Sequence, residues 1–297
     1  EKLVLGGYRV ITTIDTDLQN QSECVMVEQL LRVTDPEHVI LPALLDACPA
    51  ARFLTVLPPG EEDDAFSALG SSILLDPNTG QVLAYVAQKD LAAESISVSQ
   101  QPGTSLAPFV ALAGFSHGES PATLRWDIPG DDPVELEQYL SEDHDYDGPL
   151  RSREAVIQQD ALVLAEWMID AGEDEVAFFS QTAGLYSLGN TPSSAQLLFT
   201  GGDLPLVEQA AAYAVFANLG VQYGVEGEDE QYLVPQMILN VFAPGDELIL
   251  LDCTSKDSQT LIGEDLAYLV HDVLADEVLR RSEFGYPNSL SIGHPVG

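Results

Sequence analysis

Basic side chains are scarce in this chain. Its 297 residues include 11 Lys and Arg against 48 Asp and Glu, which gives a formal net charge of −37. A surface with this charge repels nucleic acid and anionic membranes, so neither is expected as a partner. Solubility or a salty environment is the simplest reason for the acidic charge. A cationic partner and bound divalent cations are the alternatives.

Long apolar runs and grouped metal ligands are missing as well. No apolar run reaches the length of a membrane-spanning helix. The acidic stretches Glu61–Asp64 and Glu226–Glu230 lack the spacing and the glycine of an EF-hand calcium loop. The five histidines are scattered, without the spacing of a metal site or a catalytic triad. We therefore expect no metal and no cofactor.

Cysteine is also rare. Cys24, Cys48 and Cys253 form no Cys-x-x-Cys pair, which argues against a zinc site. Free buried thiols are the favoured interpretation, and a disulfide between Cys24 and Cys48 is the alternative.

Local patterns in the first third predict alternating strands and helices. Tyr8–Ile14 is rich in β-branched residues and predicts a strand. Asp15 is placed to cap a helix from Thr16 to Arg32. A short helix is expected near Leu41–Ala47, followed by a strand at Arg52–Leu57.

A β-hairpin is predicted next. Ser72–Asp76 and Gln81–Val86 are strand-like, and Pro77-Asn78-Thr79-Gly80 between them has the residues of a tight turn.

Longer apolar patterns in the second half predict helices and strands. Two helices are expected from about Arg153 to Ala171 and from Leu206 to Leu219, and a third from Glu264 to Arg280. Val234–Val241 predicts a strand. Trp126 and Trp167 are expected to anchor the core.

The stretch from Gln101 to Val110 predicts the start of a buried helix. Gly103 permits a tight turn, and Thr104 is the candidate N-cap. Pro108 lies in the first turn, where a proline removes little hydrogen bonding.

Taken in order, the strand and helix start near Tyr8–Leu18, the hairpin and the Gln101–Val110 stretch resemble segments of the penicillin-binding transpeptidases. The first of these segments resembles the linker of the bifunctional members. The resemblance covers roughly Tyr8–Glu23 and Ser71–Gly297. It implies an α/β fold of the penicillin-binding and serine β-lactamase type, in which helices flank a mixed antiparallel sheet beside a mostly helical lobe. It also implies a linker strand and first helix in residues 1–34, a divergent insertion in 35–70 and a transpeptidase-like domain in 71–297.

The resemblance places the family's active-site positions on residues that lack its chemistry. In the family, Gln-Pro-Gly-Ser-x-x-Lys-Pro carries a nucleophilic serine and its lysine, and here Thr104 and Ala107 stand at these positions. The second motif, Ser-x-Asn, falls on Gln159-Asp160-Ala161, so both of its functional residues are replaced. The third motif, Lys-Thr-Gly, would follow Gly297. The chain has three lysines, Lys2, Lys89 and Lys256, and Lys89 would have to reach the groove unaided.

The resemblance therefore favours a catalytically inactive domain, because a serine or threonine hydroxyl needs a base to become a nucleophile. We expect a binding or scaffolding component at the extracytoplasmic face of a bacterial membrane. The alternatives are an atypical acyl-transferase or hydrolase of peptidoglycan that uses Thr104 or Ser105, and a purely architectural subunit whose groove is filled.

The expected partner is another protein of an envelope complex. The chain ends before the family's C-terminal strands, so its sheet is expected to be incomplete. A partner strand, Val10–Ile14 or Arg52–Leu57 would then cover the edge of the hairpin. Membrane attachment is expected only through a segment absent from this chain.

Overall fold

The computed structural model describes 6–35, 38–40, 42–54, 70–87, 99–100, 103–129, 140, 145–190, 195–200, 204–227, 232–245, 249–254, 256–288, 290–293 and 296. Compactness divides the chain into two units, and each unit is made of two separate stretches of sequence. The first comprises Glu1–Val98 and Gln222–Gln259, and the second comprises Ser99–Val221 and Thr260–Gly297. The three-segment division predicted from the sequence stays a prediction.

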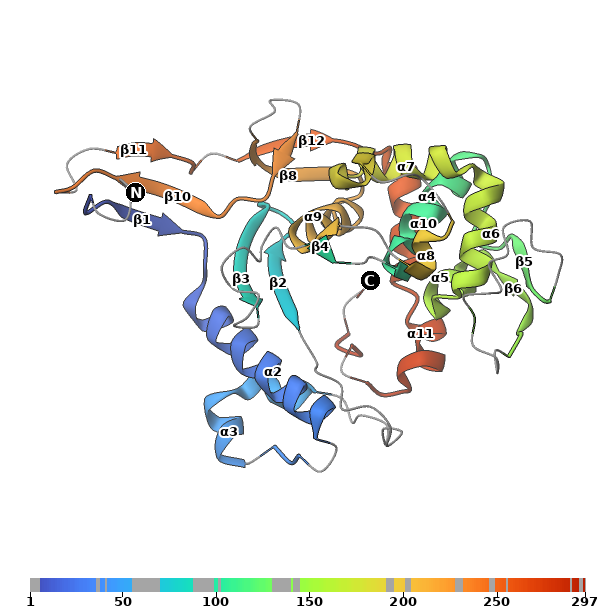
Figure 1. The fold of residues 1–297 in the computed structure, drawn as a ribbon, viewed down its shortest axis with the longest axis horizontal. Helices are drawn as coiled ribbons and strands as arrows, with labels where there is room; N and C mark the ends of the chain where they lie inside the picture. Colours follow the sequence, from blue (N-terminus) through green and yellow to red (C-terminus); the bar gives the residue numbers. More distant parts are fainter. Residues whose placement is uncertain are drawn as a thin grey trace. The chain divides into compact units, whose positions relative to one another are not determined.

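The first unit combines small antiparallel sheets with one long helix (Figure 1). Its N-terminal elements are β1 (Arg9–Thr12), α2 (Thr16–Thr34), α3 (Pro42–Ala47), the 3₁₀ turn η1 (Pro49–Phe53), β2 (Ser71–Asp76) and β3 (Gln81–Ala87). The later stretch contributes β9 (Leu233–Val234), β10 (Ile238–Phe242) and β11 (Ile249–Asp252), together with most of β8 (Val221–Glu226) and β12 (Asp257–Thr260). The sheet orders are β1-β10-β11, β12-β8-β9 and β2-β3.

The helix cap at Asp15 and the hairpin turn after Asp76 form in this unit as the sequence predicts. The Asp15 carboxylate accepts hydrogen bonds from the backbone N–H groups of Asp17 and Leu18, at 2.9 and 3.0 Å, and so caps α2. In the hairpin turn, the Asp76 carboxylate accepts from the Asn78 backbone at 3.0 Å and from the Thr79 hydroxyl at 2.8 Å. The predicted first helix and the predicted hairpin are both confirmed.

The free side of the hairpin meets other segments of the same unit. The Thr13 hydroxyl donates to the carbonyl oxygen of Val82 at 2.5 Å, and the Asp15 N–H donates to that of Leu83 at 2.9 Å. The Val82 N–H donates to the Gln236 carbonyl oxygen at 2.9 Å. Residues 13–15 thus contact β3 as one expectation had it, although the strand proper, β1, pairs with β10.

Other expectations for the first unit are wrong. Cys24 and Cys48 form a disulfide with Cα atoms 6.2 Å apart, and only Cys253 is a free thiol. The segment predicted as a strand, Arg52–Leu57, begins inside η1, because Pro49 starts a 3₁₀ turn that includes Arg52 and Phe53. Residues 55–57 lie outside the described part of the chain.

The second unit is mostly helical, and its principal helices are α4 (Ala107–Ser116), α5 (Ser152–Gln158), α6 (Ala161–Ala171), α7 (Glu173–Thr182), α9 (Leu206–Ala217), α10 (Glu264–Leu274) and α11 (Glu277–Phe284). Shorter elements are β4 (Ser99–Gln100), the 3₁₀ turns η3 (Gly103–Leu106) and η5 (Tyr186–Asn190), β5 (Leu124–Asp127), β6 (Gly148–Arg151), α8 (Leu197–Thr200) and β7 (Leu204–Pro205). β4 pairs with β7, and β5 pairs with β6.

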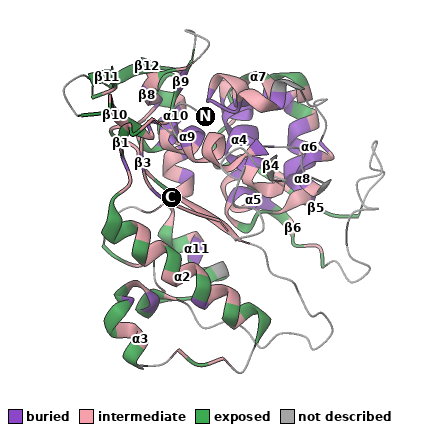
Figure 2. Cartoon of the chain, turned by 60° about the vertical axis from the view of Figure 1, so that its left-hand side comes forward, coloured by how far each residue is buried: buried purple, intermediate pink, exposed green. Residues whose placement is uncertain are grey.

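The core of this unit surrounds α4, whose residues from Ala107 to Phe115 are all buried. Figure 2 shows this burial concentrated in α4, α6 and their neighbours. Phe109 packs on Phe216, with ring centroids 5.3 Å apart. Trp167 on α6 is fully buried, as predicted, and Trp126 on β5 is 55% exposed, which corrects the prediction of a second core tryptophan.

Two long helices predicted from apolar patterns are each broken in two. The helix expected to run from Arg153 to Ala171 ends at Gln159, which has a left-handed backbone, and Asp160 caps the next helix by accepting from the Val163 N–H. The helix expected from Glu264 to Arg280 stops at Leu274, and the Asp276 carboxylate caps α11. An aspartate that bonds nearby backbone N–H groups competes with helix continuation.

Candidate functional site

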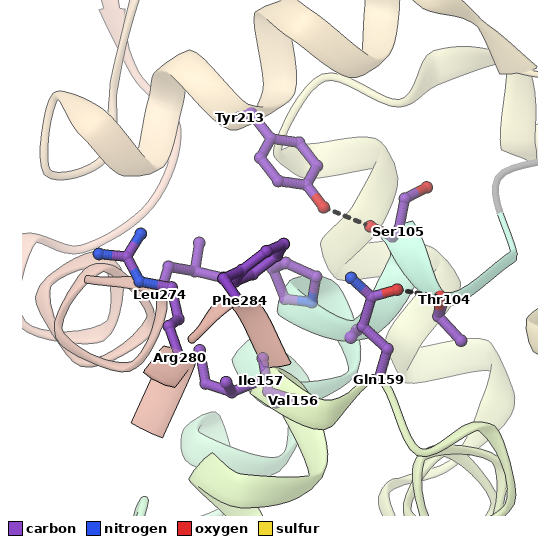
Figure 3. Close-up of a pocket in the computed structure, with 11 residues that line it drawn as sticks. Thr104, Ser105, Val156, Ile157, Gln159, Tyr213, Leu274, Arg280 and Phe284 are labelled. Atoms are coloured by element: carbon purple, nitrogen blue, oxygen red, sulfur yellow. Dashed lines mark hydrogen bonds between the residues drawn. The ribbon is translucent and has the colours of Figure 1, made fainter. Parts of the chain in front are cut away.

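The candidate site is a cavity of about 380 Å³ in the second unit, at the N-terminal end of α4. Its lining comes from η3 and the first turn of α4, from the end of α5, and from α9, α10 and α11 (Figure 3). The residues are Thr104, Ser105, Ala107, Pro108, Val156, Ile157, Gln159, Tyr213, Leu274, Arg280 and Phe284. We call this cavity the groove.

η3 carries Thr104 and Ser105 to the groove. Gly103 opens this turn with φ of +52°, a conformation that glycine adopts without strain. The α-helix itself begins at Ala107 with Leu106 as its N-cap, and no side chain caps it. The expectation that Thr104 caps the helix is therefore wrong, because Thr104 lies inside the 3₁₀ turn that precedes α4 and its hydroxyl bonds to the Gln159 side chain.

Thr104 and Gln159 meet in the groove. The Thr104 hydroxyl donates a hydrogen bond of 2.9 Å to the amide oxygen of Gln159, and Figure 3 shows the two side chains pointing toward one another. Gln159 reaches this position because it ends α5 with φ of 57° and ψ of 38°, an uncommon conformation for a residue other than glycine. Such backbone strain often occurs at functional sites.

The other two predicted site residues have different surroundings. Ala107 lines the groove beside Thr104, and its methyl group offers no base. Ala161 begins α6 after the Asp160 cap and is not part of the groove lining. The structure thus brings Thr104, Ala107 and Gln159 together in the groove lining, whereas Ala161 lies at the start of α6 outside that lining.

Thr104 has no ionisable neighbour that could take its proton within the described residues. Its hydrogen-bond partner, the neutral amide oxygen of Gln159, accepts a hydrogen bond but does not act as a base near neutral pH. Lys2 and Lys89 lie outside the described residues. The Lys256 ammonium, in the first unit, donates to the carbonyl oxygen of Asn78 at 2.8 Å and lies over the Tyr223 ring.

Three residues that the sequence patterns did not single out complete the groove. The Tyr213 hydroxyl donates to the Ser105 carbonyl oxygen at 2.8 Å, and burial raises the pKa of Tyr213 to about 12. Tyr213 is therefore neutral at physiological pH. Arg280 and Phe284 lie one helical turn apart on α11 and face the groove. Their i, i+4 spacing was visible in the sequence, but nothing in the pattern indicated which side of the helix would be buried.

Metal binding and membrane crossing find no support in the described part of the chain. No group of three or more His, Cys, Asp or Glu side chains there is arranged to hold a metal ion. No described helix combines the length and the apolar character needed to cross a bilayer.

Comparisons in sequence find relatives among penicillin-binding proteins, although no protein-family model matches this chain. Penicillin-binding protein 1A of Neisseria meningitidis is 28% identical over an alignment of 172 residues, which covers 55% of this chain and 21% of the relative. Penicillin-binding protein 1A of Vibrio cholerae is 25% identical over an alignment of 230 residues, which covers 69% of this chain and 27% of the relative. The chain spans about a fifth to a quarter of the length of these curated relatives.

Comparisons of structure agree. The penicillin-binding protein PonA1 of Mycobacterium tuberculosis matches 92% of this chain with a TM-score of 0.67 and 18% identity, over 64% of that chain. Penicillin-binding protein 1A of Haemophilus influenzae matches 91% with a TM-score of 0.62 and 17% identity, over 54% of that chain. These matches confirm the predicted fold class and the resemblance on which it depends.

Proposed function

Since the chain has a transpeptidase-like fold of the penicillin-binding-protein type, we propose that it is a catalytically inactive member of that fold, a pseudoenzyme that uses its groove to bind a ligand. The atypical acyl-transferase or hydrolase remains the competing candidate. The inactive domain and the atypical enzyme differ in whether a group in the groove can take the proton of a hydroxyl and so make it a nucleophile.

The observation that carries the proposal is the environment of Thr104. Acyl transfer by a hydroxyl requires a general base within about 3 Å of the oxygen. In the described residues that place is occupied by the Gln159 amide oxygen, at 2.9 Å. One helical turn on, where the family has its lysine, Ala107 presents a methyl group. Ser105 gains nothing by a one-residue shift, because Pro108 stands three positions after it.

Two features support a binding role over a filled, purely architectural groove. The cavity of about 380 Å³ falls within the range of small-molecule sites, roughly 300–1,000 Å³. Its lining mixes apolar walls with a few polar groups, as binding pockets do. The relatives suggest the setting: we propose the extracytoplasmic side of a bacterial membrane, within a protein complex of peptidoglycan synthesis.

Covalent labelling by a fluorescent penicillin tests the proposal. The purified protein is incubated with the probe, denatured and resolved on a gel, next to an active penicillin-binding protein 1A as positive control. Protein that was heat-denatured before incubation serves as the blank. We expect the signal of the native protein to equal the blank.

Labelling above the blank would overturn the proposal. Thr104→Ala and Ser105→Ala variants would then identify the nucleophile, because loss of the label in one of them assigns the acyl group to that hydroxyl. Both variants are small changes at a partly exposed turn, so each is expected to fold.

A further inference from the structure

Arg280 on α11 is a buried cation that has no partner among the described residues. It is 8% exposed, and its Nε atom is buried and makes no hydrogen bond. No hydrogen bond or ion pair joins its guanidinium to another described residue. This is unexpected in a chain with 48 acidic side chains and 11 Lys and Arg, where a counter-charge is easily supplied. Because an unpaired buried charge is costly, the position calls for an explanation.

The guanidinium lies beside a second cavity of this unit, at the junction of α10 and α11. The cavity has a volume of about 490 Å³, within the range of small-molecule sites, and we call it the α10–α11 cavity. Arg280 touches both cavities, but in Figure 3 Phe284 lies between its guanidinium and the Thr104–Gln159 pair of the groove. The charged end of Arg280 therefore belongs to the α10–α11 cavity.

Two carboxylates line the same cavity, and neither of them pairs with Arg280. Asp272 is bound by the Arg153 guanidinium at 2.7 Å. Glu277 precedes Arg280 by three residues on α11, a spacing at which opposite charges commonly pair. Its carboxylate lies instead 3.6 Å from the guanidinium of Arg281, and both of these side chains are exposed. Exposed pairs of this kind are weak, so Glu277 can readily exchange Arg281 for another cation.

This combination of charges selects a ligand that carries both signs. A purely anionic ligand would be repelled by Asp272 and Glu277, and a purely cationic one by Arg280. A neutral ligand would leave Arg280 unpaired. Residues three apart on a helix are neighbours on its surface, which suits a ligand whose two charges are close together, as in an α-amino acid. His271 adds a ring nitrogen that can donate or accept a hydrogen bond.

We propose that the α10–α11 cavity binds a zwitterionic α-amino acid with an apolar side chain. The Arg280 guanidinium fork holds the two oxygens of its carboxylate, and the Glu277 carboxylate holds its ammonium group. Tyr268, Leu290 and Ile292 line the cavity and supply apolar surface for the ligand side chain. Tyr268 and Ile292 are 55% and 58% exposed, so this surface is available to be covered. The inference goes beyond the proposed function and does not depend on whether the groove reacts.

Matched probes test the need for both charges. Leucine and phenylalanine, each in the L and the D form, are zwitterions near neutral pH. Their N-acetyl derivatives lack the cation, and their amides lack the carboxylate. Affinities are measured by titration calorimetry or ligand-observed NMR on the full protein. We expect at least one of the amino acids to bind, and to bind tenfold or more tightly than either of its two derivatives.

Two variants assign the ligand charges to residues. Arg280→Met keeps much of the length of the side chain and removes the cation, so it should abolish the preference for the amino acid over its amide. Glu277→Gln keeps the shape and removes the anion, so it should abolish the preference over the N-acetyl derivative. Arg151→Met and Glu175→Gln are matched controls at residues outside the lining, and both preferences should stay as in the wild type.

The proposal is overturned if none of the amino acids binds the wild-type protein, or if an amino acid binds no more tightly than its amide or its N-acetyl derivative. It is overturned as well if either variant retains the preference that it should lose. Should Arg280→Met fail to fold, the probes on the wild type and the exposed Glu277→Gln change still decide. Penicillin labelling reports on the groove alone, so it would refute the inactive-domain proposal without bearing on the α10–α11 cavity.

Discussion

Replacing Gly114 by alanine should destabilise the second unit, although alanine is the better helix former. Gly114 lies inside α4, and its missing side chain faces Trp167. A Cβ atom built there would lie 2.6 Å from both Cε2 and Cζ2 of the indole ring. No real pair of carbon atoms packs at that distance, so the ring or the helix must move.

The size of the effect follows from two opposing terms. Gly→Ala in a helix interior gains about 1 kcal/mol of helix propensity. Forcing an extra carbon into a packed core costs about 1–3 kcal/mol. The upper end applies here because Trp167 is fully buried, packs edge-on against Phe115, and lies under the Arg125 guanidinium at 4.9 Å. We expect a net loss of about 2 kcal/mol, which lowers Tm by about 4–8 °C in a protein of this size.

Thermal unfolding of wild type and Gly114→Ala, followed by circular dichroism, measures this loss. Trp167→Phe supplies the control, because phenylalanine lacks the indole atoms that the new Cβ would meet. In that background the same glycine substitution should cost at least about 1 kcal/mol less, a coupling typical of residues in contact. A Tm that stays constant or rises in Gly114→Ala with Trp167 present would show that the ring has room, and the packing argument would be wrong.

Three further outcomes are expected. Raising sodium chloride from low to molar concentration should raise Tm, because counterions screen the repulsion within a chain of net charge −37; a flat or falling Tm would count against this. Reducing the Cys24–Cys48 disulfide should destabilise its segment by about 3 kcal/mol, through the chain entropy that is regained on unfolding. Hydrogen–deuterium exchange that is no faster in α3 after reduction would contradict it. Burial acts to raise the pKa of Asp76, but hydrogen bonds from Thr79 and Asn78 outweigh it, so the pKa is lowered from 3.8. The turn is therefore stabilised above that pH and loses this contribution as the pH falls below it, and Asp76→Asn should remove this acid dependence in an NMR titration.

Much of the local structure could be predicted from the sequence, because short-range chemistry determines it. Asp15 caps α2 through backbone groups two and three residues away. The turn after Asp76 depends on its own side chains, and Gly80 supplies the left-handed backbone with φ of +70°. The lack of a lysine near Thr104 is likewise a property of the sequence, and so is the acidic charge.

The identity of the buried residues required the tertiary structure. Trp126 and Trp167 look alike in the sequence, yet one is 55% exposed on β5 and the other is fully buried on α6. The breaks at Gln159 and Asp276 were missed because the apolar pattern continues through them. At both places an aspartate side chain captures backbone N–H groups that a continuous helix would have used.

The groove itself depends on contacts between distant parts of the chain. Thr104 and Gln159 are 55 positions apart, and Tyr213 bonds to a carbonyl group 108 positions away. The sequence determined which chemical groups are available: a threonine hydroxyl with alanine three residues on, a neutral amide and a few arginines among many carboxylates. The tertiary structure alone decided that Arg280 would be buried beside this groove with no counter-charge among the described residues, because the surroundings of a charge depend on which side of α11 packs inward.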